Sequence, residues 1–203
     1  MTIEKGRAWG AHAPLPADGV VVRGDSEARE IVTEARRAGN PVPVVGLLGG
    51  DMCRTVGGRG DQARLRTADA MTLPLDVGSV LIDGRMHWFT AHLVARRGWW
   101  RGRVVAVMNA QWIGSWDVAP RAHPNDGLLD VLDGDLGLDD RIKARRRLFT
   151  GTHVPHPDIS QRRVSAIEID LQKPTPIWLD GEQVAAGRHL SVRVEPDAYA
   201  CVV

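Results

Sequence analysis

The chain has 203 residues, of which 43% are hydrophobic and 25% are charged, and its formal net charge is +1. This length fits one large domain or two small ones that can bury a core, and the composition is that of a globular protein. The balanced charge gives no general reason to expect a nucleic acid or an anionic membrane as partner. No apolar run reaches the roughly 18 residues of a membrane span.

The cysteines and the N-terminus bear on the cellular compartment. Cys53 and Cys201 lie far apart and without metal-ligand spacing, so we expect no disulfide framework and a reducing, cytoplasmic location. The segment from Met1 to Gly10 carries charged residues and no apolar core, unlike a secretory signal.

Residues 20–48 predict a β-α-β unit. An apolar strand at 20–22 precedes Asp25, a plausible helix cap, and Gly39 is placed to end the helix. The Val-rich run 42–48 fits a strand covered on both faces, so we expect parallel strands with a right-handed crossover. The helix is predicted from apolar residues at helical spacing, namely Ala28, Ile31, Val32 and Ala35.

Gly49-Gly50-Asp51 follows the second of these strands. Open α/β sheets bind ligands beyond the carboxyl ends of their strands, and two glycines let backbone N–H groups approach a phosphate closely. The alternative is a tight turn that leaves the strand without a ligand. We expect the side chain of Met52, the next residue, to crowd a phosphate at this position.

The N-terminal part is short for a nucleotide-binding domain. Residues 57–70 are polar and glycine-rich, and they are the best candidate for a linker. Only 22 residues separate Asp51 from Pro74, whereas a further β-α-β unit needs roughly 30 or more. We therefore expect a reduced α/β portion.

From Leu75 onward the apolar period changes to two, which predicts many short strands and a sandwich or barrel-like sheet. A hairpin turn is expected at Asp83-Gly84, and one helix at 139–149 with acidic residues first and basic residues later. The fold class is thus α+β, a reduced N-terminal α/β unit followed by a larger antiparallel β-sandwich-like domain. The expected strands are 75–82, 86–95, 103–110, 128–132, 164–171, 177–179, 190–194 and 199–203.

A polar turn, His123-Pro124-Asn125-Asp126-Gly127, leads into the strand at 128–132. Proline, asparagine and glycine favour such a turn. It offers a carboxylate and several carbonyls at one point, which a hard cation such as Mg²⁺ accepts. An ordinary Asx turn without a ligand is the alternative.

The histidines and tryptophans each leave two interpretations open. His153 and His156, with His123 and Asp126 as neighbours in space, suit zinc or another transition metal. Prolines on both sides of His156 prevent a helix from presenting both histidines on one face, so a structural role is the alternative. For the tryptophans, one interpretation is packing in a core and the other is a lipid-binding groove. Five of them lie close in sequence, namely Trp88, Trp99, Trp100, Trp112 and Trp116.

A basic run lies on the predicted helix at 139–149. Such a run is usually a solvated face, but it also suits an anionic headgroup or a phosphate. Double-stranded nucleic acid is disfavoured because acidic residues balance the charge overall. The run consists of Arg141, Lys143, Arg145, Arg146 and Arg147.

Several short motifs, taken in order, resemble the diacylglycerol kinase-like lipid kinases of the NAD kinase-like superfamily. Gly49-Gly50-Asp51 resembles the nucleotide loop of the family. Five further segments resemble motifs in the C-terminal domain of the family. They are Ala119-Pro120-Arg121, His123 to Val131, Gly151-Thr152-His153 with His156-Pro157, Asp180-Gly181-Glu182, and Val194 to Ala198. The resemblance implies a reduced nucleotide-loop portion with linker at 1–70 and a β-rich C-terminal domain at 71–203, whose last strand can return to the first portion.

By this resemblance the chain would transfer the γ-phosphoryl group of ATP to the hydroxyl of a diacylglycerol-type lipid, with Mg²⁺. Glu182 would be the general base and Asp51 would help organise the nucleotide. Gly49, Gly50 and Thr55 would contact the nucleotide, and Asp126 would hold Mg²⁺ together with carbonyls near His123 and Leu128.

Three functions stay open at this point. No second nucleotide loop of the family's Gly-Thr-Gly-Asn-Asp type occurs between Asp51 and Pro74. An inactive member that binds lipid or another partner is therefore the alternative to the kinase, and a metal-dependent hydrolase comes third. The expected partner is a lipid or small molecule, not a nucleic acid; a peripheral membrane contact and a homodimer are compatible with the resemblance.

Overall fold

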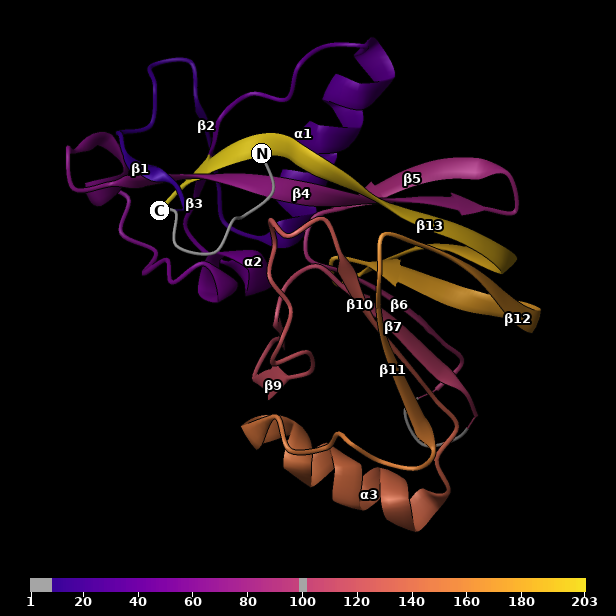
Figure 1. Cartoon of the computed structure of the whole chain (residues 1–203). Helices are drawn as coiled ribbons and strands as arrows, with labels where there is room; N and C mark the ends of the chain where they lie inside the picture. The colour runs from indigo at the N-terminus through magenta and orange to yellow at the C-terminus, as the bar shows by residue number, and fades with distance from the viewer. Residues whose placement is uncertain (1–8, 99–101) are drawn as a thin grey trace.

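The predicted β-α-β unit forms the N-terminal part of the computed structural model, which describes residues 9–98 and 102–203 (Figure 1). Strand β2 (Val20–Val22) pairs in parallel with β3 (Val45–Leu47), and helix α1 (Asp25–Ala38) connects them. Gly39 ends α1 with φ of 67°, a left-handed conformation that glycine adopts without strain. Most of the N-terminal segment weighed as a signal, together with Trp99 and Trp100, lies outside the described residues.

The predicted cap of α1 was wrong by one residue. Gly24 occupies the N-cap, with no side-chain hydrogen bond to the first turn, and Asp25 is the first helical residue. The Asp25 side chain leaves its own helix because it bonds to the short helix α2 (Gly50–Thr55) instead.

The segment predicted as a linker is packed against the N-terminal strands. It contains the 3-10 turn η1 (Arg64–Arg66), and Leu65 is only 2% exposed. The Leu15 N–H donates to the Leu65 carbonyl at 2.7 Å, just after β1 (Ala11–His12). The polar composition of 57–70 concealed two buried apolar positions, Leu65 and Ala70.

The predicted period-two region forms strands, with several corrections. The predicted strand at 86–95 is two strands that break at Thr90-Ala91, the segments 164–171 and 177–179 belong to one strand, and so do 190–194 and 199–203. Strands β8, β9 and β11 were not predicted. The elements are β4 (Met71–Ile82), β5 (Arg85–Phe89), β6 (His92–Arg96), β7 (Val104–Met108), β8 (Trp112–Ile113), β9 (Trp116–Asp117), β10 (Leu129–Gly134), α3 (Leu138–Arg147), η2 (Leu148–Thr150), β11 (Ile159–Val164), β12 (Ala166–Leu179) and β13 (Glu182–Val202).

Strand β13 joins the two parts of the molecule. The main strand order is β1-β4-β13-β12-β6-β7-β10-β11, with antiparallel pairing along that path, and β5 pairs with β4. The last residues of β13 run parallel to β3, where Cys201 pairs with Val45. The chain is thus α+β, with a small parallel unit attached to a larger antiparallel sheet (Figure 1).

Separate hydrophobic clusters stabilise the two parts. One cluster packs α1, α2 and β3 against β4 and the end of β13, and includes Val32, Leu47 and Met52. A second lies between the strands of the larger sheet, where Phe89 and Leu179 are fully buried. No described helix has the length and apolar character required to cross a membrane, and both cysteines are free and buried.

Candidate functional site

The turn predicted to hold a phosphate is filled by a carboxylate of the protein itself. Asp25 accepts hydrogen bonds from the backbone N–H groups of Asp51 (2.5 Å) and Met52 (3.0 Å). These amides begin α2 and are the donors that a phosphate would use. Gly50 has φ of 92°, and a Cβ atom there would lie 2.5 Å from an Asp25 carboxylate oxygen. The glycine therefore allows the close approach of Asp25.

The side chain of Met52 does not enter this turn. It is 1% exposed and belongs to the core cluster with Leu47 and Val32. Our expectation that it would crowd a phosphate was wrong, because the first turn of α2 directs the side chain inward while its N–H faces Asp25. The obstacle to a phosphate at this turn is Asp25.

Asp25 carries its charge in a poorly solvated position. It is 8% exposed, and burial, then the negative charge of Asp180, raise its pKa to about 6. Asp180 is itself buried and accepts from the N–H groups of Thr90, Ala91 and His92 at 2.8 to 2.9 Å. Burial also raises the pKa of Asp180.

Asp51 pairs with a histidine that connects it to the same network. Its Oδ2 lies 3.0 Å from Nε2 of His92, and its Oδ1 accepts from the Gly114 N–H at 2.7 Å. Burial lowers the pKa of His92, but the hydrogen bond to Asp51 and the charges of Asp180 and Asp51 outweigh this, so its pKa is raised. Thr55 is satisfied internally, since its Oγ1 donates to the Asp51 carbonyl and accepts from the Gln111 N–H.

Glu182, the predicted general base, forms an ion pair with Arg29. The two groups approach to 2.5 Å, and the Glu182 side chain is 54% exposed. Arg29 lies one turn beyond Asp25 on α1. Consecutive turns of α1 therefore contact the Gly-Gly-Asp turn and Glu182, which brings two of the three predicted acids to one helix.

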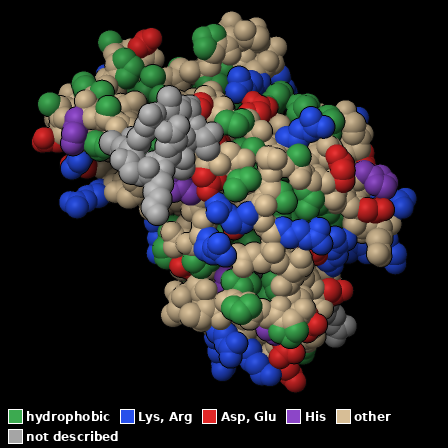
Figure 2. All heavy atoms as spheres, in the orientation of Figure 1, with side chains coloured by type: hydrophobic (Ala, Val, Ile, Leu, Met, Phe, Trp, Pro, Cys, Tyr) green, Lys and Arg blue, Asp and Glu red, His purple; other side chains and the backbone are tan. Residues whose placement is uncertain are grey.

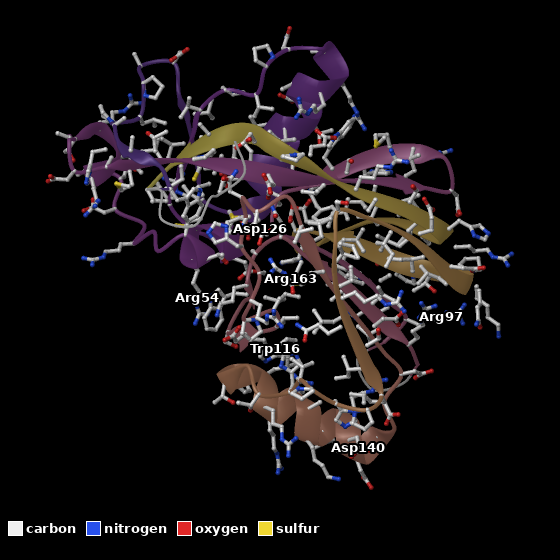
Figure 3. All side chains as sticks on the ribbon, in the orientation of Figure 1. Arg54, Arg97, Trp116, Asp126, Asp140 and Arg163 are labelled. Carbon is white, nitrogen blue, oxygen red and sulfur yellow. The ribbon has the colours of Figure 1, made fainter. Side chains whose placement is uncertain are left out.

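Asp126, the third acid, binds a cation supplied by the chain. The Arg163 guanidinium of β11 bonds to Asp126 and lies 3.2 Å from Asp130 (Figure 3). The Leu128 N–H donates to the other Asp126 oxygen at 3.0 Å. Because the guanidinium neutralises this carboxylate, the turn as it stands does not fit Mg²⁺. The predicted metal role of Asp126, His123 and Leu128 stays a prediction that requires Arg163 to move away.

His123 contributes to packing in this part of the chain. Its ring lies 4.5 Å from that of Trp9, between centroids, and its Nδ1 accepts from the Asn125 N–H. Burial lowers the pKa of His123. Among the described residues, no hydrogen bond or ion pair joins Asp126 directly to Asp51 or Glu182; the two regions are linked through Asn109, whose amide donates to the carbonyls of Asp76 (2.9 Å) and Thr90 (2.8 Å).

Asp76 organises the turn around Asp126, and the sequence reasoning missed it. It is fully buried in β4 and accepts from the N–H groups of Gly127 (2.8 Å) and Asp197 (2.9 Å) and from the Asn125 amide (3.3 Å). Burial raises the pKa of Asp76. A lone aspartate within an apolar strand pattern was the signal that could have identified it.

An apolar pocket lies between α3 and the outer face of the sheet, away from these acids. Its volume is about 140 Å³, close to that of engineered apolar cavities that bind benzene. Trp116, one of the tryptophans weighed for a lipid groove, is in its wall. The apolar wall includes Val94, Ala106, Ile113, Trp116, Val118, Leu132, Leu148 and Ile159.

His153 is a polar group in the wall of this pocket. It is 3% exposed; among the described residues neither ring nitrogen makes a hydrogen bond of good geometry, although the Val118 backbone lies close enough to act on the ring as a hydrogen-bond partner. Burial lowers its pKa, which favours the neutral ring. A neutral imidazole has one donor and one acceptor nitrogen, so His153 keeps at least one ring nitrogen to offer a ligand.

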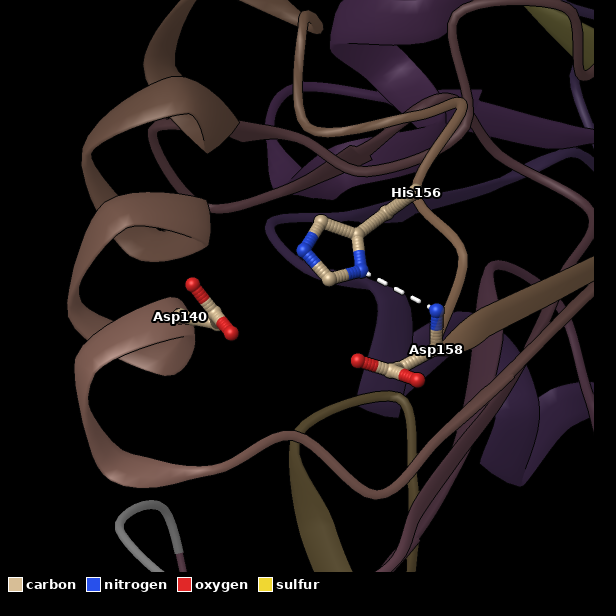
Figure 4. A group of neighbouring side chains, drawn as sticks. All are labelled: Asp140, His156 and Asp158. Atoms are coloured by element: carbon tan, nitrogen blue, oxygen red, sulfur yellow. Dashed lines mark hydrogen bonds between the residues drawn. The ribbon is translucent and has the colours of Figure 1, made fainter.

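The other predicted histidine lies apart from His153, beside two acids. One ligand atom from each of Asp140, His156 and Asp158 lies within 4.8 Å of the others (Figure 4). However, the Asp158 N–H donates to Nδ1 of His156, and Lys143 pairs with Asp140 at 3.1 Å. A neutral histidine that accepts at Nδ1 carries its proton on Nε2, so this group is not arranged for a metal.

Comparisons with known proteins agree with this architecture. A family model described as the YegS C-terminal NAD kinase beta sandwich-like domain matches residues 77–203. A solved structure of a candidate diacylglycerol kinase from Bacillus anthracis str. Sterne is similar, with a TM-score of 0.73, 14% identity, and coverage of 91% of this chain and 77% of that chain.

Two further structures from the same organism give the same picture. One described in the same way has a TM-score of 0.69, 14% identity, and coverage of 91% and 77%. One described as a diacylglycerol kinase has a TM-score of 0.64, 14% identity, and coverage of 91% and 75%. At this identity the likeness shows the fold alone. A comparison with curated protein sequences finds no match.

Proposed function

Because this chain belongs to the diacylglycerol kinase-like lipid kinase family, we propose that it is a lipid-binding member whose nucleotide and magnesium sites are closed by its own side chains. The observation that carries the proposal is the Asp25 carboxylate, which occupies the amides of Asp51 and Met52. In this state side chains of the protein already make the contacts that were predicted for ATP and Mg²⁺.

Charge supports this proposal at each predicted contact of Mg·ATP. A phosphate entering the Gly-Gly-Asp turn would have to displace Asp25, which would lose its two hydrogen bonds to the turn, or lie beside its negative charge, which repulsion between like charges opposes. Mg²⁺ at Asp126 would have to displace the Arg163 guanidinium. Glu182 already pairs with Arg29. Each predicted group thus has an internal partner of the opposite charge or an internal hydrogen-bond partner.

The pocket beneath α3 is the proposed place for the lipid. Its wall is apolar apart from His153 and the nearby arginines Arg141 and Arg145. Burial of methylene groups stabilises binding by about 0.8 kcal/mol each, and His153 offers one hydrogen bond to an ester or hydroxyl oxygen. The size of the pocket limits it to a section of one acyl chain, so we expect short-chain diacylglycerol to bind.

Calorimetry separates this proposal from a nucleotide-dependent function. We expect heat of binding with dioctanoylglycerol and none with ATP and Mg²⁺. His153→Leu should weaken lipid binding by roughly fivefold, the equivalent of about 1 kcal/mol for one hydrogen bond. His156→Leu is the matched control and should bind as the wild type does. Micromolar binding of Mg·ATP to the wild type would contradict the proposal.

The predicted kinase chemistry is the second candidate, favoured by the position of α1. Asp25 and Arg29 bring the Gly-Gly-Asp turn and Glu182 to consecutive turns of one helix. If the internal pairs opened, Glu182 would take the proton of the lipid hydroxyl while the hydroxyl oxygen attacks the γ-phosphorus of ATP and ADP leaves. Asp51, Gly49, Gly50 and Thr55 would contact the nucleotide, and Mg²⁺ would neutralise phosphate charge near Asp126.

Transfer of labelled phosphate from ATP to a panel of lipids, with Mg²⁺ present, tests this second candidate. Activity that Glu182→Gln abolishes would support it. Glu195→Gln is the matched control, because Glu195 also pairs with an arginine of α1, Arg36, at 2.9 Å. Equal activity of wild type and Glu182→Gln would refute the role of Glu182 as base. A homodimer and a cytoplasmic location stay predictions beside either candidate.

A further inference from the structure

A second pocket lies where the polar segment 57–61 passes the ends of β3 and β13. Its volume is about 330 Å³, larger than the 140 Å³ of the pocket under α3, and small-molecule pockets measure roughly 300 to 1,000 Å³. None of the three acids predicted for catalysis is among its described wall residues. We call it the strand-end pocket, and its apolar wall is formed mainly by Trp9, Leu47, Leu65, Met71, Leu73 and Val203.

The strand-end pocket occupies a place in the fold where α/β proteins bind ligands. The end of β13 runs parallel to β3, with Cys201 beside Val45. Leu47 is the last residue of β3 and Val203 follows β13, so both lie at the carboxyl ends of neighbouring parallel strands. Both residues line the pocket. Open α/β sheets bind ligands beyond such ends.

Glycines bring a single arginine to this pocket. Residues 57–60 are Gly-Gly-Arg-Gly, and all four line it. A Cβ atom on Gly58 would lie 2.5 Å from Sγ of Cys53, and one on Gly60, whose φ is 71°, would lie 2.6 Å from the carbonyl oxygen that follows β3. The segment can pack this closely only because these residues have no side chain. Arg59, which is exposed, is thus the one side chain that 57–60 contributes.

The strand-end pocket carries an excess of positive charge. Its charged wall residues are Arg59, Arg64 and Asp61. The Asp61 carboxylate accepts from the N–H groups of Ala63 (3.0 Å) and Arg64 (3.3 Å). Among the described residues neither guanidinium forms an ion pair, and that of Arg64 donates only to the neutral Asp69 carbonyl at 2.7 Å. Figure 2 shows basic side chains at the end of the molecule where Figure 1 places β1 and the C-terminus. The pocket therefore favours an anion.

The backbone of the segment does not suit a phosphate. The N–H groups of Gly57 and Gly58 donate to carbonyls of α2 at 3.2 and 2.8 Å. Burial raises the pKa of the Cys53 thiol, and a hydrogen bond from the Gly60 N–H opposes that rise. All three glycine amides thus have partners, whereas a phosphate-binding loop keeps its amides for the ligand. The guanidinium groups remain, and one guanidinium matches one carboxylate through two parallel hydrogen bonds.

Trp9 gives the pocket an aromatic wall. Its Nε1 donates to the Pro74 carbonyl at 3.3 Å, and its ring centroid lies 4.5 Å from that of His123. These contacts hold the indole in place. Aromatic rings gain free energy by packing against one another beyond the gain from buried area, and Leu47 and Leu65, each 2% exposed, add apolar contact. The wall therefore favours a flat, apolar body on the ligand.

We propose that the strand-end pocket binds a small aromatic carboxylate. The ring system packs against Trp9 and the leucines, the carboxylate pairs with Arg59, and Arg64 adds positive charge. The pocket shares no described wall residue with the pocket under α3. This inference therefore does not depend on the proposed function.

Calorimetry of the full chain with indole-3-acetate and its neutral analogue indole-3-acetamide tests the proposal. We expect the acid to bind at least roughly tenfold more tightly than the amide, because a hydrogen bond to a charged group is the stronger kind. Arg59→Gln should weaken binding of the acid by roughly tenfold and leave that of the amide unchanged. Arg66→Gln is the matched control, because Arg66 is an exposed neighbour that donates to the Pro16 carbonyl at 3.2 Å; it should bind as the wild type does.

Four results would overturn the proposal: no binding of the acid, equal binding of acid and amide, unchanged binding of the acid by Arg59→Gln, or displacement of the acid by inorganic phosphate. Circular dichroism confirms that each variant is folded. Ala106→Leu, in the wall of the pocket under α3, separates the two pockets. It should bind indole-3-acetate as the wild type does, and loss of binding would place the acid under α3 instead.

Discussion

Replacing Asp25 by asparagine should change how the stability of the protein depends on pH. The carboxylate is buried beside Asp180, and its pKa in the folded state is about 6, compared with an ordinary value of 3.8. At 1.36 kcal/mol for each pKa unit, this difference corresponds to about 3 kcal/mol. Asparagine has a similar shape but does not titrate.

The sign follows from which state holds the proton. Between about pH 4 and pH 6 the unfolded chain releases the proton of Asp25 while the folded chain still holds it. The free energy of unfolding therefore falls as the pH rises through this range, and above the folded pKa the loss stays constant. The wild type should lose about 2 to 3 kcal/mol relative to Asp25→Asn between about pH 4 and pH 7.

Urea denaturation of both proteins across this range measures the difference. Asp83→Asn is the control, because backbone N–H groups of His189 and Arg188 lower the pKa of Asp83, so its contribution changes only below the range studied. If the curves of wild type and Asp25→Asn run parallel, Asp25 is not a buried carboxylate, and the inference that it fills the Gly-Gly-Asp turn is refuted.

Three further variants test the remaining parts of the interpretation. Arg163→Gln leaves Asp130, whose side chain is 1% exposed, without its cation, so we expect the free energy of unfolding measured in urea to fall by about 2 to 3 kcal/mol. Added Mg²⁺ should restore the stability of the variant and leave that of the wild type unchanged. Ala106→Leu should fill the pocket, raise stability by about 1 kcal/mol and abolish dioctanoylglycerol binding in calorimetry; retained binding would place the lipid elsewhere. Glu182→Gln should lower the unfolding free energy by less than about 1 kcal/mol, because its pair with Arg29 is half-exposed, and a larger loss would show that this pair is structural.

Local pattern was sufficient for most of the secondary structure. The end of α1 at Gly39, the hairpin turn at Asp83-Gly84 and the charge order of α3 were all predicted, because each depends on residues within a few positions along the chain. The length of β13 was not predicted, since Pro196 is unfavourable within a strand. A register shift between Glu195 and Tyr199 accommodates it, and the pairing partner β4 continues on both sides.

The ordered motifs also identified the family and the three acids weighed for catalysis. The partners of these acids were decided by the tertiary structure, because they come from distant positions: Arg29 reaches Glu182 across 153 residues, and Asp25 reaches the amide of Asp51 across 26. A motif specifies which side chain is present, whereas sheet register and helix packing decide which charge lies beside it. The sequence by itself therefore determined the family, and the fold determined that the predicted acids and amides already have partners within the protein.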